Sequence, residues 1–160
     1  MSVFSVRLRD LCGKKFFMHL DEIKAAIPHR EPFLWVDEVV ELTESKIIAK
    51  KTLDPKIDLF AGHYPAYPIL PGVIGCEMTF QAAAILMSKI APVVEGKVPV
   101  VTRVNNVQFR KIMRPGQTVQ IEAELTEKMG DVYLFNGKVL SEGKPATRLE
   151  FAVTVAPVES

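Results

Sequence analysis

Three residues along one segment of the sequence combine types that could perform acid–base chemistry on a carbonyl compound. His63 lies in a proline-rich loop, Gly72 stands at the expected start of a helix, and Glu77 is the one carboxylate within that helix. The first backbone N–H groups of a helix lack partners within it and carry partial positive charge. A base, an acid and an N–H group aimed at a developing oxyanion suit proton removal next to a carbonyl, with loss of a group one carbon further on.

The same residues also have structural interpretations. A carboxylate in an apolar helix is costly unless it is paired, hydrogen-bonded or protonated, and Gln81, four residues further on, could hydrogen-bond it. Glu77 could instead cap a strand or pair with an arginine, and a loop histidine is more often structural than catalytic. Gly72 would let a ligand approach the backbone closely. The residues alone therefore leave the catalytic and the structural interpretations open.

Length, charge and cysteine content exclude several classes of protein. The chain has 160 residues, which suits one domain, and its net charge of +1 gives no overall field that favours nucleic acid. Cys12 and Cys76 belong to no metal-binding motif, which predicts a reducing compartment and no zinc site. Charged residues within 7–10 occupy the place where a signal peptide needs its apolar stretch. We expect a cytoplasmic protein, with residues 1–18 as an N-terminal extension and residues 19–160 as a single domain.

The hydrophobic pattern predicts an α+β protein in which one long helix precedes a series of antiparallel strands. Residues 72–90 form that helix, and because apolar residues cover nearly every face of it, a sheet should wrap around it and bury it. Glu77, Gln81 and Lys89 within the helix disfavour a membrane span. The predicted strands are residues 33–41, 46–53, 98–109, 118–128, 131–141 and 146–156, with a short helix at 20–26 and a stiff, extended loop at 60–71.

Three sequence segments resemble one enzyme family. The spacing of His63, Gly72 and Glu77, with the prolines between them, resembles the signature of the FabZ-type 3-hydroxyacyl-[acyl-carrier-protein] dehydratases. Residues 27–37 are similar to the family's upstream segment, which contains the sequence Pro-His-Arg, and residues 109–117 are similar to its Pro-Gly turn segment. The resemblance covers most of the chain and implies the hotdog fold, in which a long antiparallel sheet wraps around one central apolar helix.

The resemblance also implies roles for the residues of the motif. His63 would be the catalytic histidine and Glu77 the catalytic acid, supplied by opposite subunits of a dimer. The Gly72 N–H group would polarise the thioester carbonyl, and the Ile69 carbonyl would orient His63. Gln81 would position Glu77 because of its spacing on the same helix face. The product would be a trans-2-enoyl thioester in fatty acid or related lipid biosynthesis. No metal or redox cofactor is implied, and the substrate would arrive on the phosphopantetheine arm of an acyl carrier protein.

Further residues are assigned by position in these motifs. Tyr64, Pro65 and Phe80 are candidates for the substrate tunnel, although Phe80 replaces a small family residue and an aromatic side chain in this helix also suits the core. Trp35 replaces a leucine and has the same two interpretations. His29 and Asp37 are interpreted as structural: His29 within the turn, and Asp37 as a hydrogen-bond acceptor at the end of a strand. The candidate carrier-protein contacts are Arg103, Arg110, Lys111 and Arg114, with a solvated strand face as the alternative.

Two other functions fit the same fold. Hotdog thioesterases hydrolyse acyl thioesters and typically place one carboxylate on the helix, whereas this sequence has both His63 and Glu77. A non-catalytic acyl-thioester binding module is the second alternative. The sequence leaves the acyl chain length open, and it does not distinguish a homodimer from a trimer of dimers.

Overall fold

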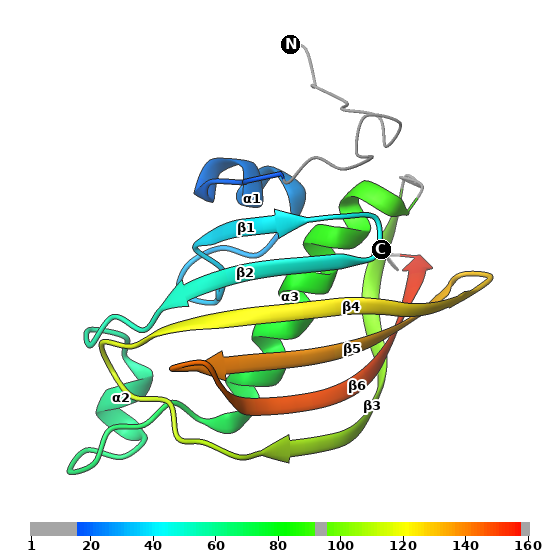
Figure 1. Cartoon of the computed structure of the whole chain (residues 1–160). Helices are drawn as coiled ribbons and strands as arrows, with labels where there is room; N and C mark the ends of the chain where they lie inside the picture. Colours follow the sequence, from blue (N-terminus) through cyan, green and yellow to red (C-terminus); the bar gives the residue numbers. More distant parts are fainter. Residues whose placement is uncertain (1–15, 92–95, 158–160) are drawn as a thin grey trace.

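The computed structural model describes residues 16–91 and 96–157, which form one antiparallel sheet and three helices (Figure 1). The elements follow the chain as α1 (Leu20–Ala26), β1 (Glu38–Leu42), β2 (Lys46–Thr52), α2 (Leu59–Gly62), α3 (Gly72–Ile90), β3 (Lys97–Phe109), β4 (Thr118–Met129), β5 (Val132–Ser141) and β6 (Lys144–Pro157). The strand order across the sheet is β1-β2-β4-β5-β6-β3, and every pairing is antiparallel.

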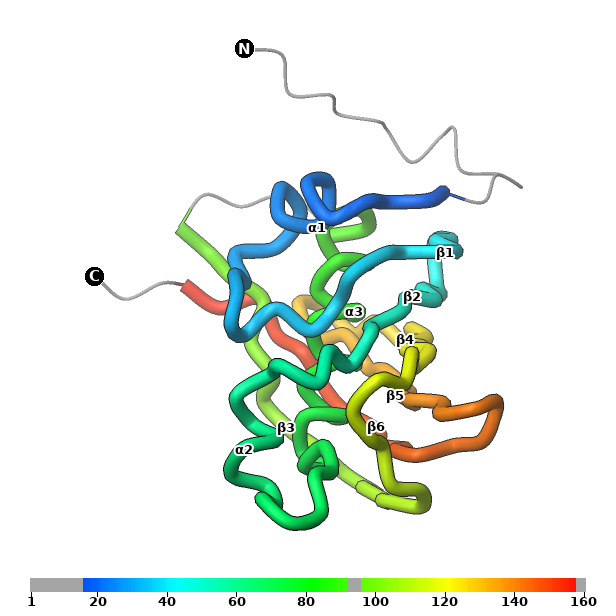
Figure 2. Tube along the Cα trace, turned by 90° about the vertical axis from the view of Figure 1, so that its left-hand side faces the viewer, coloured from blue at the N-terminus to red at the C-terminus, as the bar shows by residue number. Residues whose placement is uncertain are grey.

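Two tight turns set the register of the longest strands. Gly130 has a positive φ of 60° between β4 and β5, and Glu142 and Gly143 have positive φ values of 51° and 72° between β5 and β6. Two successive residues with positive φ suit the strong right-handed twist of a two-residue hairpin. The resulting strands are long enough for the sheet to curl around α3 (Figure 2).

The inner face of the sheet packs against α3. Side chains in β5 alternate between the two faces, so Tyr133, Phe135 and Val139 are buried against the helix side. Gly137 lies in the same strand, and a Cβ added there would lie 2.9 Å from the Cβ of Thr79 in α3. The helix and sheet therefore approach more closely than a side chain at Gly137 would allow. This arrangement confirms the predicted α+β class and the hotdog fold.

The predicted element boundaries hold for both main helices but not everywhere else. The strand expected from residue 33 begins only at Glu38, because the backbone of Phe33 and Trp35 bonds to a side chain of α3 instead of a neighbouring strand. The loop expected at 60–71 begins inside a helical turn, α2. The expectation that α3 is buried on all faces is wrong as well. The sheet covers only part of its circumference, and Val73 is 63% exposed.

The strand β3 forms one edge of the sheet, where it pairs only with β6. All its residues are exposed, and they include a series of apolar side chains: Val98, Val100, Val101, Val104, Val107 and Phe109. A long, apolar, unpaired edge is unusual because it invites pairing with another strand.

Residues 1–15, most of the predicted extension, lie outside the described residues, whereas Met18 is buried and exchanges backbone hydrogen bonds with Val39 at 3.1 and 2.9 Å. Within the described chain, α3 has the length and apolar composition of a membrane-spanning helix. More than half of that segment is buried inside the protein, as in the core helix of a globular domain.

Candidate active site

His63 is held by three bonds at the end of α2. Its backbone N–H group donates to the Leu59 carbonyl at 2.9 Å, and its carbonyl accepts from Ile69 N at 3.0 Å. Its ring Nδ1 lies 3.0 Å from the Ile69 carbonyl oxygen. Because a carbonyl oxygen only accepts, Nδ1 carries the ring proton and Nε2 keeps a lone pair. The contact expected with Ile69 is present, and it leaves His63 able to take a proton at Nε2.

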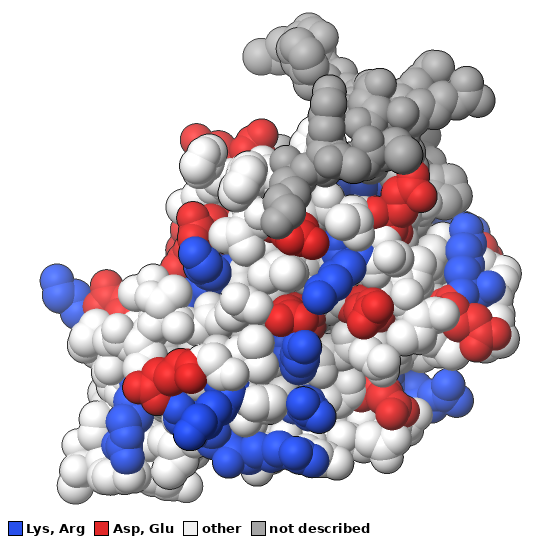
Figure 3. Space-filling view, viewed as in Figure 1, with Lys and Arg blue, Asp and Glu red and all other residues white. Residues whose placement is uncertain are grey.

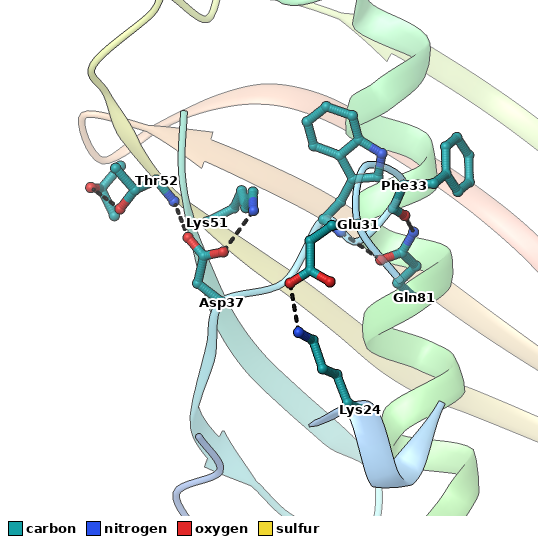
Figure 4. Close-up of polar contacts among 9 residues, drawn as sticks. Lys24, Glu31, Phe33, Asp37, Lys51, Thr52 and Gln81 are labelled. Carbon is teal, nitrogen blue, oxygen red and sulfur yellow. Dashed lines mark hydrogen bonds and ion pairs between the residues drawn. The ribbon is translucent and has the colours of Figure 1, made fainter. Parts of the chain in front are cut away.

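Glu77 is half-buried on α3, and Gln81 holds it. The Gln81 Nε2 group donates to Glu77 Oε1 at 2.8 Å and to the Phe33 carbonyl at 2.8 Å. The Gln81 Oε1 atom accepts from Trp35 N at 2.8 Å. Figure 4 shows how this fully buried amide joins the helix to the segment that precedes β1. One amide therefore fixes the carboxyl group and docks that segment on the helix.

Gly72 begins α3 and lies against an aromatic ring. A Cβ added to it would lie 2.6 Å from Cδ1 of Phe109, so no larger residue fits without movement of that ring. From the sequence, a glycine here was expected to let a ligand approach the backbone. The contact with Phe109 is a second reason why residue 72 is a glycine. No side chain caps the N-terminus of α3 at Pro71. The Ile74 N–H group donates to the Pro71 carbonyl at 3.0 Å, so the N–H groups of Gly72 and Val73 are the ones at the open end of the helix.

A pocket of about 330 Å³ opens beside Glu77. Its lining residues come from α3, the two strands β3 and β6, and the segment before β1: His29, Glu77, Phe80, Ala84, Pro99, Val101 and Val153. The carboxyl group and an imidazole mark its polar end, and the rest is apolar. The pocket therefore suits a ligand with a polar reacting group and an apolar chain.

Phe80 takes both of the roles that the sequence left open. It lines the pocket, and its ring packs edge-on against Phe151 of β6, with 4.9 Å between the ring centroids. Trp35, which posed the same question, is buried in the core. Tyr64 and Pro65 are exposed on the loop after His63 and do not line this pocket, and Tyr64 stacks on the His63 ring.

Comparison with known proteins places the chain in a family. The family model for ApeI-like proteins, described as ApeI dehydratase, matches residues 39–144. The chain belongs to this dehydratase family. Curated relatives of the dehydratase include the 3-hydroxyacyl-[acyl-carrier-protein] dehydratase FabZ of Clostridium perfringens, 39% identical over 81% of the chain and 92% of the relative. The FabZ of Rickettsia bellii is 36% identical over 85% of the chain and 94% of the relative. The predicted family and enzyme class are confirmed.

Solved structures agree on the fold of the dehydratase. The ApeI:P dehydratase heterocomplex of Xenorhabdus doucetiae aligns with a TM-score of 0.67 at 14% identity, covering 84% of the chain and 90% of that structure. A hypothetical thioesterase of Streptococcus pneumoniae with coenzyme A aligns with a TM-score of 0.61 at 10% identity, covering 88% and 99%. At these identities the likeness concerns the fold alone.

The four basic residues considered for carrier-protein binding lie in two separate parts of the surface. Arg103 lies within β3, whereas Arg110, Lys111 and Arg114 follow the end of that strand. Seven residues of extended strand separate Arg103 from Arg110, which is roughly 20 Å. In Figure 3 lysine and arginine side chains gather along the lower rim of the molecule.

The three residues after β3 have different partners. Lys111 pairs with Glu142, and the hydrogen bond and charge of Lys111 lower the pKa of that carboxyl group. Arg110 donates to Gln108. The Arg114 guanidinium lies 4.4 Å from the ring centroid of Tyr67 and donates to its hydroxyl, which brings a cation to the loop that carries His63.

Two residues of the upstream motif, residues 27–37, have clear positions in the structure. Asp37 has the role that was expected, whereas the contact of His29 with Glu77 was not expected from the sequence. Asp37 accepts from Lys51 Nζ at 2.6 Å and from Thr52 N at 2.8 Å, so it is the strand-end acceptor that was predicted (Figure 4). His29 was interpreted as part of a turn, but its Nε2 atom lies 3.7 Å from Glu77 Oε1 inside the pocket. The available signal was its place in a motif shared with the family.

Proposed function

We propose that the enzyme removes water from 3-hydroxyacyl thioesters carried by an acyl carrier protein and forms trans-2-enoyl thioesters. The proposal depends mainly on two side chains at motif positions that are oriented by hydrogen bonds. His63 has an unprotonated Nε2 atom, and Glu77 is held by Gln81. Relatives named FabZ, which match over most of their own length, support the same substrate class. Fatty acid or related lipid biosynthesis in the cytoplasm is the setting that fits this chemistry.

The proposed reaction uses three groups of the chain. His63 Nε2 removes a proton from C2, while the N–H group of Gly72 stabilises the negative charge that develops on the thioester oxygen. Glu77 donates a proton to the hydroxyl on C3, which leaves as water. The C2–H and C3–O bonds break and a C2–C3 double bond forms, so atoms and charge balance.

A homodimer is part of this proposal. His63 does not line the pocket beside Glu77, and the described chain shows no hydrogen bond or ion pair between the two side chains. The exposed apolar edge of β3 is suited to pairing with the same strand of a second copy. Such a pairing would cover the pocket and bring the partner subunit's His63 to Glu77. A trimer of such dimers would add contacts elsewhere on the surface.

The substrate and its carrier would approach from different directions. The acyl chain would lie in the pocket along Phe80, Ala84 and Val153. The acidic carrier protein would dock on the basic residues near the His63 loop. Among these residues, Arg114 contacts the loop directly, through the ring of Tyr67. The domain of residues 19–160 supplies one half of each site in this arrangement.

Two variants test the proposal. His63→Ala removes the base and Glu77→Gln removes the acid, so each should lower hydration of a crotonyl thioester by about 100-fold or more. Size-exclusion chromatography should show the wild-type oligomer in both variants, because neither side chain belongs to the core. Wild-type activity in either variant would contradict the assignment.

A thioesterase is the alternative to test directly, because several solved structures with this fold are named as thioesterases. A thioesterase would release free thiol from acyl thioesters, whereas the dehydratase would not. A non-catalytic binding module would bind acyl thioesters without turnover of either kind. Monitoring thiol release and enoyl absorbance on the same substrates separates the three functions.

A further inference from the structure

We infer that His29 is a positioning residue that fixes which oxygen of Glu77 carries the catalytic proton. His29 lines the same pocket as Glu77, and its Nε2 atom lies 3.7 Å from Glu77 Oε1. The inference rests on the proposed function, because it assigns a role within that site.

The tautomer of His29 follows from its surroundings. Its Nδ1 atom is buried and has no hydrogen-bond partner among the described residues. A buried N–H group without a partner is costlier than an acceptor without one. The proton of the neutral ring therefore resides on Nε2, which points to the carboxyl group of Glu77. This tautomer is the opposite of the one that the Ile69 carbonyl imposes on His63.

Two donors consequently face the same oxygen of Glu77. Gln81 Nε2 already donates to Oε1 at 2.8 Å, and His29 Nε2–H approaches that atom from the pocket. In a carboxylic acid, the oxygen that accepts hydrogen bonds is the carbonyl oxygen, and the proton resides on the other. Oε2 is then the atom that holds the proton for the leaving hydroxyl. A separation of 3.7 Å is longer than a hydrogen bond, but such contacts often tighten when substrate binds.

The segment that carries His29 is held by contacts of the residues before and after it. The Arg30 side chain donates to the carbonyls of Ile27 at 2.9 Å and His29 at 2.7 Å, which closes the turn. Glu31 forms an ion pair with Lys24 of α1 at 2.7 Å (Figure 4). Further along, Gln81 bonds the backbone on either side of residue 34. His29 is therefore held in place before any ligand arrives.

Two substitutions of His29 separate positioning from a structural role. The amide nitrogen of His29→Gln can reach the place of Nε2, whereas that of His29→Asn lies near the place of Nδ1. We expect His29→Asn to lower kcat for hydration of a crotonyl thioester by about tenfold or more with a nearly unchanged KM. His29→Gln should recover most of that loss. His19→Asn, at the exposed N-cap of α1 where asparagine is favoured, is the matched control and should leave kcat unchanged.

A double-mutant cycle shows whether His29 acts through Glu77. In a Glu77→Gln background, His29→Asn should cause no further loss of kcat, because the proton that it positions is gone. Equal kcat in the Asn variant and the wild type, or a further loss in the Glu77→Gln background, would overturn the inference. So would a folded His29→Gln variant whose kcat is about tenfold or more below that of the wild type, a comparison that stays available if the Asn variant fails to fold. A wild-type protein without hydration activity would contradict the proposed function instead.

Discussion

At the scale of single residues, the proposed site uses two imidazoles that hold their protons on opposite nitrogens. The Ile69 carbonyl takes the Nδ1 proton of His63 and leaves Nε2 as a base. His29 lacks a partner at its buried Nδ1 atom and presents Nε2 to Glu77. The presence or absence of one carbonyl oxygen at Nδ1 thus decides whether the Nε2 atom of a histidine accepts or donates a proton. Neither histidine needs a charge on its ring for these roles.

Gln81 should matter for both stability and rate. Gln81→Leu leaves the Phe33 carbonyl and the Trp35 N–H group without their partner and frees the Glu77 carboxyl group. We expect a loss of about 2–3 kcal/mol in the free energy of unfolding, from one buried N–H group and one partly buried carbonyl left unpaired, together with a lower kcat. Urea denaturation and steady-state kinetics measure the two effects. The control, Gln120→Leu, removes a single bond to Glu122 and should cost about 1 kcal/mol at most.

Glu122 makes the stability depend on pH. Burial raises its pKa, but hydrogen bonds from Lys138 and Gln120 and the charges of Lys138 and Lys46 outweigh burial, so its pKa lies below its usual value of 4.5. A carboxyl group with a lowered pKa in the folded state stabilises the protein above pH 4.5 and loses that contribution as the pH falls through the folded value. Urea midpoints should therefore fall less between pH 5 and pH 3 in Glu122→Gln than in the wild type. Parallel pH curves for the two proteins would contradict this.

At the scale of elements, close contact between α3 and the sheet sets the position of Glu77. Glycines allow this contact: a Cβ on Gly137 of β5 would meet Thr79, and one on Gly75 of α3 would meet Thr147. Glu77 lies on the same helix, two residues before Thr79 and two after Gly75. A shift of α3 away from the sheet would therefore move the Glu77 carboxyl group relative to Phe33 and Trp35, which Gln81 bonds in the segment before β1.

A methyl group at Gly137 should test this packing. Gly137→Ala places a Cβ 2.9 Å from Thr79 Cβ, and overpacking of this kind costs about 1–3 kcal/mol. Adding Thr79→Ala should recover part of the loss, because it removes Thr79 Oγ1, which lies 2.9 Å from the new methyl group, while the Cβ of residue 79 stays. Gly62→Ala, which meets nothing within 4 Å, is the control and should leave the unfolding midpoint unchanged. Additive losses in the double variant would show that the two positions do not compete for space.

At the scale of the whole molecule, we propose that one copy of the chain presents half a site. The pocket beside Glu77 lies next to the exposed strand β3, and His63 is held on a separate loop. A dimer joined along β3 would account both for the apolar edge and for the missing base. Each active site would then combine groups from two chains.

Mixing two inactive variants tests this arrangement. When His63→Ala and Glu77→Gln chains are unfolded together and refolded, half of the dimers should be mixed, and each mixed dimer should hold one intact site. We expect about a quarter of the wild-type activity, against almost none for either variant refolded alone. A mixture as inactive as its components would place both groups in the same chain. Refolded wild type supplies the reference activity.

The sequence was sufficient for the features that depend on local pattern. The bounds of α3 and most strands follow from periodicity and turn residues, which are short-range properties. The hotdog class and the roles expected of His63, Gly72 and Glu77 follow from the resemblance of short motifs to one family. Only the tertiary structure decided the rest. Gln81 reaches Phe33, 48 residues away, and His29 lies beside Glu77 because the segment before β1 folds onto α3. Likewise, the helix that looked buried on every face is open along one side, since the extent of a curled sheet depends on contacts between strands far apart in the chain.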